Sequence, residues 1–310
     1  MTPFAIAGIQ MPITTTDNIQ AMKHRLELTM HLYPWVQMVM FSELAPYGPL
    51  LHHAQKLPGR AEEAFQELAA HHGIWVLPGS MFERADGQIY NTASVIDPNG
   101  EVVGRYRKLF PFQPYEQGVT PGEEFLVFDV PDVGCFGVSI CYDIWFPETS
   151  RTLTALGAEV ILHPVLTHTI DRDVDLNIAY ATAAMFQCYV FDINGLAAGG
   201  NGRSAVIDPA GRTLHRADGH EQIIPIEIDL DQVRRQRRHG MRGLGQPLKS
   251  FRDRRVDFRV YDRAHGDDSY LQSLGALEKP TRLAPSQAVD VVTEASPEGS
   301  DSQVEPSGSC

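Results

Sequence analysis

The sequence predicts an α/β fold in which sheets and helices form separate layers. Short apolar runs, such as residues 4–9 and 36–41, alternate with longer segments whose apolar residues have helical spacing. A second observation is an internal repeat, because residues 95–100 (VIDPNG) recur as 206–211 (VIDPAG). Two similar halves, each a sheet with helices on one side, would pack sheet to sheet as a four-layer α-β-β-α sandwich. Unrelated hairpins also favour such a turn, which leaves this simpler explanation of the repeat open.

Each element is predicted from its periodicity and its boundaries. In the first half we expect a strand at 4–9, a helix from a cap at Asp17 to about Tyr33, a strand at 36–41, a helix at 61–72, a strand at 74–80 and a hairpin around the turn at 98–100. In the second half we expect strands at 125–130 and 134–140, a helix starting near Pro147, a strand at 160–165, a helix at 174–187, a strand at 189–195 and a hairpin over 203–215.

The C-terminal part of the chain differs in composition from the rest. We predict a main domain over 1–262, an extension over 263–280 and a disordered tail over 281–310. The tail is rich in serine, proline and acidic residues and lacks the apolar content needed to fold. Arginine is dense between about 233 and 260, where it alternates with Val, Phe and Tyr. In an acidic chain, this pattern favours ion pairs within or between subunits over nucleic-acid binding.

Composition restricts the partners and the compartment. The net charge of −13 argues against nucleic acid and against an anionic membrane surface as partners. The four cysteines contain no CxxC pair and form no disulfide framework, so a reducing compartment is the simpler interpretation. The N-terminus does not resemble a signal peptide, and no run approaches the roughly 18 apolar residues that span a bilayer. We therefore expect a cytoplasmic, soluble protein.

Cys141 is the candidate nucleophile. It follows the apolar run 137–140 and precedes a helix that opens at Phe146 and Pro147. A cysteine at the end of a strand, ahead of a helix, lies exposed at the rim of a sheet, where backbone N–H groups can face a developing oxyanion. The competing interpretation is a buried structural cysteine, which is the more common role of a free thiol.

Two charged residues are candidate partners for this thiol. A thiol with its usual pKa of about 8.5 needs a base or a nearby cation to react at neutral pH. Glu43 lies just past the strand at 36–41, and Lys108 lies just past the hairpin. A carboxylate can accept the thiol proton, and an ammonium group can stabilise both a thiolate and an oxyanion. Taken singly, both would be ordinary solvated surface charges.

Three separated motifs, in order, resemble the carbon–nitrogen hydrolase (nitrilase) superfamily. They are FSEL with a following Gly48, YRKL with a following Pro111, and SICYDIWFPE, which contain Glu43, Lys108 and Cys141 respectively. Further resemblances are YNTA at 90–93 and GNGRS at 200–204, so that the likeness covers roughly 4–262.

The resemblance implies a fold and a set of roles. The fold is the four-layer α-β-β-α sandwich. Glu43 would be general base and then general acid, and Lys108 would stabilise the tetrahedral intermediate together with the backbone N–H of Tyr142. Cys141 would form a thioester that water hydrolyses, and no cofactor is implied. Glu116 resembles the second glutamate that aliphatic amidases and formamidases place on this loop to orient the substrate; otherwise it is a surface acid.

Residues near Cys141 bear on the bond that is cut. Tyr142 and Asp143 resemble the amidase and carbamoylase branches, whereas nitrilases have Trp-Glu at these positions. Omega-amidases often have Arg where this chain has Trp145, so an anchored substrate carboxylate is not expected. Trp145 instead offers an apolar wall, which suits a short aliphatic or aromatic amide or an N-carbamoyl amine, or simply packs in the fold. A nitrilase, a thioester-based acyltransferase and a binding protein without activity are the alternatives.

The remaining signals lead to further expectations. Asp171, Asp173 and Asp175 resemble the start of an EF-hand loop, but Leu176 stands where glycine is required. No HExxH or Cys/His spacing indicates zinc, and residues 199–202 do not fit a nucleotide-binding GxGxxG motif, so no metal and no cofactor are expected. We expect His163, at a strand end, to line the substrate pocket with Tyr142 and Trp145. Extensions like 240–280 often reach a neighbouring subunit in the family, which predicts a homo-oligomer, a dimer or higher.

Overall fold

The computed structural model describes residues 1–169, 171–262 and 269–279. Met1–Gly275 form one compact unit, and the fold below is that of this unit. The described residues of the second unit, 276–279, form neither helix nor strand. The predicted tail, residues 281–310, lies outside the described residues.

The first sheet contains the N-terminal strands and has parallel strands at its centre. Its order is β16 (Gln222–Asp229), β1 (Pro3–Gln10), β3 (Met38–Phe41), β4 (Trp75–Leu77), β6 (Gln88–Ile96) and β5 (Met81–Ala85), and β7 (Val102–Arg107) also pairs with β6. Strands β1, β3 and β4 run parallel, whereas β6 and β7 form the predicted hairpin. The side chains of β3 are buried on both faces, as expected for a central parallel strand.

The second sheet repeats this plan in the other half of the chain. Its order is β15 (Thr213–Arg216), β14 (Ala205–Ile207), β11 (Tyr189–Asn194), β10 (Val160–Val165), β9 (Gly134–Val138) and β8 (Leu126–Val130). Strands β9, β10 and β11 are parallel, and β14 and β15 form the second predicted hairpin. A small third sheet joins β13 (Gly200–Asn201), β12 (Leu196–Ala197) and β2 (Pro12–Ile13).

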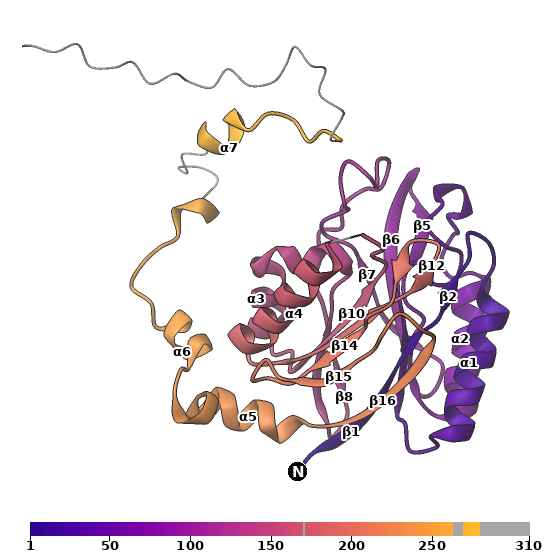
Figure 1. Ribbon diagram of the computed structural model, residues 1–310, viewed down its shortest axis with the longest axis horizontal. Coiled ribbons are helices and arrows are strands. Elements are labelled where there is room, and N and C mark those ends of the chain that lie inside the picture. Colours follow the sequence, from indigo (N-terminus) through magenta and orange to yellow (C-terminus); the bar gives the residue numbers. More distant parts are fainter. Residues whose placement is uncertain (170, 263–268, 280–310) are drawn as a thin grey trace, which may run out of the picture. The chain divides into compact units, whose positions relative to one another are not determined.

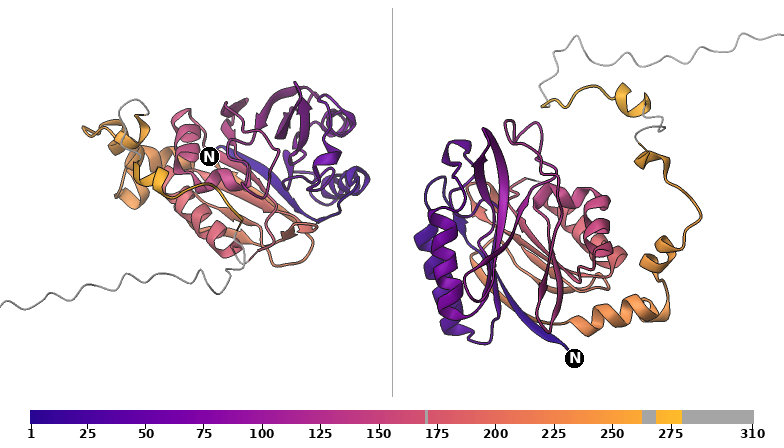
Figure 2. Two further views of the ribbon diagram at one scale, coloured as in Figure 1. Left: turned by 90° about the horizontal axis from the view of Figure 1, so that it is seen from above. Right: turned by 180° about the vertical axis from the view of Figure 1, so that it is seen from behind.

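Two pairs of helices cover the outer faces of the large sheets. The helices are α1 (Ile19–Leu32), α2 (Arg60–His72), α3 (Pro147–Ala155), α4 (Arg172–Phe186), α5 (Leu230–His239), α6 (Pro247–Arg252) and α7 (Ser269–Ser273), and the 3-10 turns are η1 (Leu51–His53), η2 (Cys141–Trp145), η3 (Met241–Gly243) and η4 (Arg259–Tyr261). Figures 1 and 2 show α1 and α2 on one side of the sheets and α3 and α4 on the other. Within the described residues, no helix combines the length and apolar character needed to cross a membrane.

Alternating side chains build the layers. On β3, Met38 and Met40 pack between the two sheets, whereas Val39 and Phe41 face the helices α1 and α2. On β10, Leu162 likewise packs between the sheets and Ile161 toward α3 and α4. The predicted four-layer α-β-β-α sandwich is therefore confirmed.

Some predicted details are corrected. Asn18, not Asp17, is the residue that precedes α1, although the Asp17 carboxylate accepts a hydrogen bond of 2.9 Å from the Ile19 backbone N–H and so performs the expected capping. Strand β16 and helix α5 were not predicted. In α5, Arg234 pairs with Glu159 at 2.8 Å, so part of the arginine-rich stretch does form ion pairs within the chain.

Candidate active site

Cys141 lies just beyond the carboxyl end of β9, as the first residue of the 3-10 turn η2. Its backbone φ is 46°, a left-handed value that a residue other than glycine adopts only at a cost in energy. The turn raises the thiol at the edge of the second sheet and leaves the first N–H groups of η2 without partners inside the turn. This is the predicted arrangement of a nucleophile at a sheet rim.

Glu43 and Lys108 come from the ends of strands in the other sheet. Glu43 lies two residues past β3, and its backbone N–H donates to the Val165 carbonyl at 3.2 Å, which ties it to the end of β10. Lys108 follows β7, and its N–H donates to the Asn91 carbonyl at 2.8 Å. The two sheets therefore bring their strand ends together, as parallel strands do at ligand sites in other α/β proteins.

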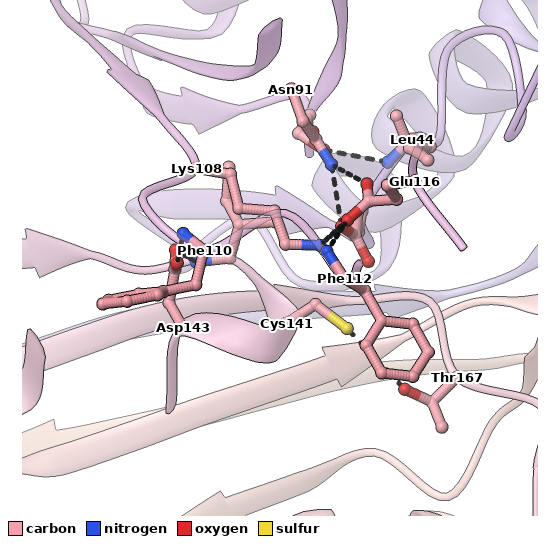
Figure 3. Close-up of polar contacts among 12 residues, drawn as sticks. Leu44, Asn91, Lys108, Phe110, Phe112, Glu116, Cys141, Asp143 and Thr167 are labelled. Atoms are coloured by element: carbon pink, nitrogen blue, oxygen red, sulfur yellow. Dashed lines mark hydrogen bonds and ion pairs between the residues drawn. The ribbon is translucent and has the colours of Figure 1, made fainter. Parts of the chain in front are cut away.

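The side chains form one network. The Lys108 ammonium nitrogen lies 2.8 Å from Glu43 Oε1 and 2.7 Å from Glu116 Oε2. Asn91 Nδ2 donates to Glu43 Oε1 at 2.8 Å and to Glu116 Oε1 at 3.3 Å. Figure 3 shows the Lys108 side chain extending toward Glu116 and the Cys141 side chain on the same side of the site. The network holds two carboxylates and one ammonium group in fixed positions next to the thiol.

The Cys141 side chain lies next to this network (Figure 3), and the charges of Glu43 and Lys108 both act on its thiol. On the other side, Sγ lies 3.7 Å from Thr167 Oγ1, a residue that follows β10. The structure thus brings together the four residues predicted for catalysis, Glu43, Lys108, Glu116 and Cys141.

Burial and charge set the ionisation of the network. Burial raises the pKa of Glu43, although the neighbouring ammonium group opposes it. Burial alone would lower the pKa of Lys108, but Glu43 and Glu116 outweigh it and hold that pKa well above its usual value. For Glu116, the attraction of Lys108 exceeds the cost of burial, and the pKa is lowered. Lys108 is therefore a permanent cation, and Glu43 is the carboxyl group closest to exchanging a proton.

The thiol itself is protonated at rest. Burial, and then the negative charge of Glu43, raise the pKa of Cys141 well above its usual value, and Lys108 only partly offsets them. For this sulfur to act as a nucleophile, a base would therefore have to remove its proton.

Asp143 connects the lysine loop, residues 106–110 around Lys108, to the cysteine turn, which is η2 with Cys141 at its start. Its Oδ2 accepts hydrogen bonds from the Tyr106 hydroxyl at 2.6 Å and from the Ile140 N–H at 2.9 Å, and its Oδ1 accepts one from the Phe110 N–H at 2.8 Å. The side chain is fully buried, and burial raises its pKa to about 6. Asp143 thereby holds the segment that carries Lys108 against the turn that carries Cys141.

Aromatic rings surround the site. Tyr142 lies 4.9 Å from Phe112 and 5.7 Å from Trp145, measured between ring centroids. Trp145 is 38% exposed, as the predicted wall requires, but its indole N–H also donates to Asp175 Oδ1 at 2.8 Å. Its surroundings are therefore not purely apolar.

His163 occupies a different position from the one expected. Its side chain is buried, and its Nδ1 lies 2.7 Å from Ser139 Oγ. It faces the α3–α4 side of the sheet with Asp192, its neighbour in the β10–β11 register. Burial lowers the pKa of His163 to about 4. His163 therefore lies inside the fold, next to Ser139 and on the face of the sheet that α3 and α4 cover.

Sequence reasoning missed three residues of the site: Asn91, Thr167 and Asp175. Asn91 had a signal, because it lies in the segment 90–93 that resembles the family, although its polar character did not distinguish it from the buried Thr92 and Ser94 of the same strand. Thr167 and Asp175 lie in a loop and in the first turns of α4, where polar residues are common and indicate nothing by themselves.

Comparison with known proteins identifies the family. The family model for the carbon-nitrogen hydrolases matches residues 5–238. The chain is 27% identical over 285 residues to an omega-amidase from Homo sapiens, a match that spans 83% of this chain and 97% of that enzyme. It is 32% identical over 183 residues to a 2-oxoglutaramate amidase from Bacillus subtilis, spanning 56% of this chain and 70% of that enzyme.

Solved structures agree in fold. A carbon-nitrogen hydrolase from Helicobacter pylori superposes with a TM-score of 0.72 at 25% identity, covering 83% of this chain and 97% of that one. An amidase from Nesterenkonia sp. superposes with a TM-score of 0.68 at 22% identity, covering 74% and 92%. Because the family model covers residues 5–238, more than half of the chain, this chain belongs to the carbon–nitrogen hydrolase family and acts on non-peptide C–N bonds.

Proposed function

We propose that this protein is an amidase that hydrolyses a small linear amide, or an N-carbamoyl amine, through a thioester on Cys141. The observation that carries the proposal is the buried Glu43–Lys108–Glu116 network, joined by contacts of 2.8 and 2.7 Å, beside a thiol on a left-handed turn. The named activities of the two relatives, an omega-amidase and a 2-oxoglutaramate amidase, support an amide over a nitrile.

The first half-reaction forms the thioester. Glu43 takes the proton from Cys141 Sγ while the sulfur attacks the amide carbon, which forms a C–S bond and a tetrahedral oxyanion. The Lys108 ammonium group and the N–H of Tyr142 stabilise that oxyanion. When the oxyanion collapses, Glu43 returns the proton to the leaving nitrogen, the C–N bond breaks and ammonia leaves.

The second half-reaction regenerates the thiol. Glu43, again a carboxylate, removes a proton from water as its oxygen attacks the thioester carbon. The second tetrahedral oxyanion meets the same two donors. Its collapse breaks the C–S bond, the carboxylic acid leaves and the sulfur regains a proton from Glu43. Glu116 and Asn91 hold Glu43 and Lys108 in place through both steps.

The test is ammonia release from a panel of primary amides and nitriles. Wild type should release ammonia from amides, Cys141→Ala should release none above background, and Cys135→Ala should retain activity. Cys135 is a suitable control because it is a second half-buried free cysteine, located on β9 instead of on the turn. Equal release by wild type and Cys141→Ala would reject the proposal, and activity on nitriles alone would favour a nitrilase.

An acyltransferase would use the same thioester with an amine in place of water. Addition of an ordinary amine such as glycine to an active reaction distinguishes the two. Under the proposal the free acid remains the main product, whereas an acyltransferase would convert most of the thioester to the amine adduct.

The proposal includes two expectations from the sequence, a cytoplasmic location and a homo-oligomer. Exposed apolar side chains in the C-terminal region support the oligomer, since Leu244 is 76% and Val260 is 72% exposed. Light scattering at micromolar concentration should give a multiple of the chain mass of 34.4 kDa. A mass of one chain would reject the oligomer without affecting the amidase assignment.

A further inference from the structure

Asp175, in the first turns of α4, is a buried carboxylate that the proposed chemistry does not use. Only 8% of the residue is exposed. The indole N–H of Trp145 donates to Oδ1 at 2.8 Å, whereas Oδ2 is buried and has no hydrogen-bond partner. A buried acceptor without a donor is costly, so a group that donates a hydrogen bond to this oxygen would be stabilised there.

The position of Asp175 relative to the thiol is defined by two contacts. Trp145 is the last residue of η2, the turn that begins at Cys141, and α4 packs on this turn. Thr167 lies 3.7 Å from the Cys141 sulfur on one side and close to the Asp175 carboxylate on the other, although without hydrogen-bond geometry to Oδ2. The Asp175 charge is near enough to the thiol to influence its ionisation. Trp145 and Thr167 therefore connect Asp175 to Cys141, and the space between these two residues is the one that a substrate would occupy under the proposal.

The cations around this space are already neutralised. Lys108 is bonded to Glu43 and Glu116. Arg172, one turn before Asp175, is fully buried and forms an ion pair with Asp192. Arg172 keeps one donor without a partner, its buried Nε, but two carboxylates, Asp192 and Asp175, act on this one cation. The local charge is therefore negative, and a substrate carboxylate would face the charge of Asp175.

The other lining groups favour a positive charge. The rings of Tyr142 and Trp145 lie beside the thiol, and aromatic faces attract cations. Burial raises the pKa of Asp175, and an adjacent ammonium group would restore its ionised form. One charge-assisted hydrogen bond to Oδ2 would satisfy the unpaired acceptor and neutralise the carboxylate together.

We propose that Asp175 forms a distal subsite that binds an ammonium group of the substrate, so that the enzyme selects amides with a protonated amine a few atoms from the carbonyl. Such a substrate has the opposite charge to 2-oxoglutaramate, the compound named for the Bacillus subtilis relative. This inference rests on the proposed amidase function and adds the class of substrate.

The test compares amides that are alike in size and differ in charge. The ammonium amides are 3-aminopropanamide and 4-aminobutanamide, the neutral isosteres are butanamide and pentanamide, and the anionic amide is succinamic acid. Wild type should show the highest kcat/KM for an ammonium amide and the lowest for succinamic acid. Asp175→Asn should lower kcat/KM for the ammonium amide about 10- to 100-fold more than for its neutral isostere.

Asp173→Asn is the matched control. Asp173 lies on the same helix but is exposed and pairs with Arg203, so this variant should retain the wild-type ranking of substrates. If Asp175→Asn lowers kcat/KM for all amides by the same factor, Asp175 only balances the charge of Arg172 and the proposal is overturned. A wild type that prefers succinamic acid would overturn it as well.

A binding measurement separates this inference from the amidase assignment. Calorimetry with Cys141→Ala should detect 4-aminobutanamide binding, and the double variant Cys141→Ala/Asp175→Asn should bind it at least tenfold more weakly. Pentanamide should show a smaller loss. Absence of ammonia release by wild type would reject the amidase function, whereas equal binding by the single and double variants would reject the subsite.

Discussion

At the level of single residues, the pKa values of the Cys141 thiol and of its proposed base Glu43 are both shifted so that the uncharged form is favoured. Burial raises the pKa of Cys141 and of Glu43, and Lys108 between them only partly offsets it. A pre-formed thiolate is therefore not the resting state of this site. The proton must move from sulfur to carboxylate during the attack, which makes the ionised fraction of Glu43 the quantity that limits activity at low pH.

The first prediction concerns the fall of activity at low pH, which is the acid limb of the pH profile. Because the pKa of Glu43 is raised, its carboxylate form predominates only at pH values above that raised pKa. The value of kcat/KM should therefore fall as the pH decreases, with an apparent pKa above the ordinary 4.5 of glutamate. A pH profile of initial rates with a neutral amide measures it. An apparent pKa at or below 4.5 would contradict the role of Glu43 as a buried general base.

Glu116 leads to a second prediction. Its charge raises the pKa of Glu43, and its carboxylate holds the Lys108 ammonium group at 2.7 Å. Glu116→Gln should therefore lower kcat about 100-fold, because the ammonium group loses a fixed partner, and should move the acid limb to lower pH. Glu123→Gln, an exposed residue of the same loop region, should change neither quantity. A loss of rate without a shift of the limb would mean that Glu116 is only structural.

At the level of the elements, strand ends explain how the site could be predicted. Residues just past β3, β7 and β9 were readable from apolar runs that stop before a charged residue or a cysteine. The sequence did not show which loops come together, because the spacing of residues along the chain does not reveal contacts between segments in different sheets. Asp143 shows this limit, since it was visible in the cysteine motif but its bond to Tyr106 depends on how two loops pack.

The contact between the lysine loop and the cysteine turn is testable as such. Tyr106→Phe removes the hydroxyl that donates to Asp143 at 2.6 Å and leaves a buried carboxylate with one fewer donor. The free energy of unfolding should fall by about 1–3 kcal/mol. Tyr180→Phe, which loses a hydroxyl bond to Thr213 near the surface, should change it by less than about 0.5 kcal/mol. Urea denaturation measures both, and equal effects would contradict a joining role for Asp143.

At the level of the whole molecule, the internal repeat was the clue to the fold. The two VIDP turns belong to hairpins at equivalent places in the two sheets, β6–β7 and β14–β15. Strand β16 escaped prediction because Pro225 lies within it and argues against a strand. It nevertheless pairs with β1 along its whole length, at the edge of the sheet. Helix α5 escaped because its composition is dominated by arginine, with few apolar residues to give a period.

Two buried groups make opposite contributions to stability against pH. The pKa of His163 is about 4 in the fold instead of 6.5, so the unfolded chain binds more protons between these values and stability rises with pH. The pKa of Asp143 is about 6 instead of 3.8, so the folded chain binds more protons there and stability falls as pH rises. The two effects offset each other in the wild type.

Single variants should separate them. Between about pH 4 and pH 6, the unfolding free energy of Asp143→Asn should increase with pH more steeply than that of wild type, by on the order of 2 kcal/mol over the range. The unfolding free energy of His163→Gln should rise with pH less steeply than that of wild type, or fall, and the difference from wild type should be of similar size. Urea denaturation at both ends of the range measures the change within each protein. Shifts of the same sign in the two variants would contradict the assigned ionisation states.

The account as a whole depends on a covalent bond between substrate and Cys141. Rapid mixing with the best amide, acid quench and intact-mass analysis should show a mass increase equal to the substrate less ammonia. Peptide mapping should place it on Cys141, and Cys141→Ala should show neither adduct nor turnover. An adduct on Cys135 or Cys188 instead, or undiminished turnover by Cys141→Ala, would contradict the catalytic centre described above.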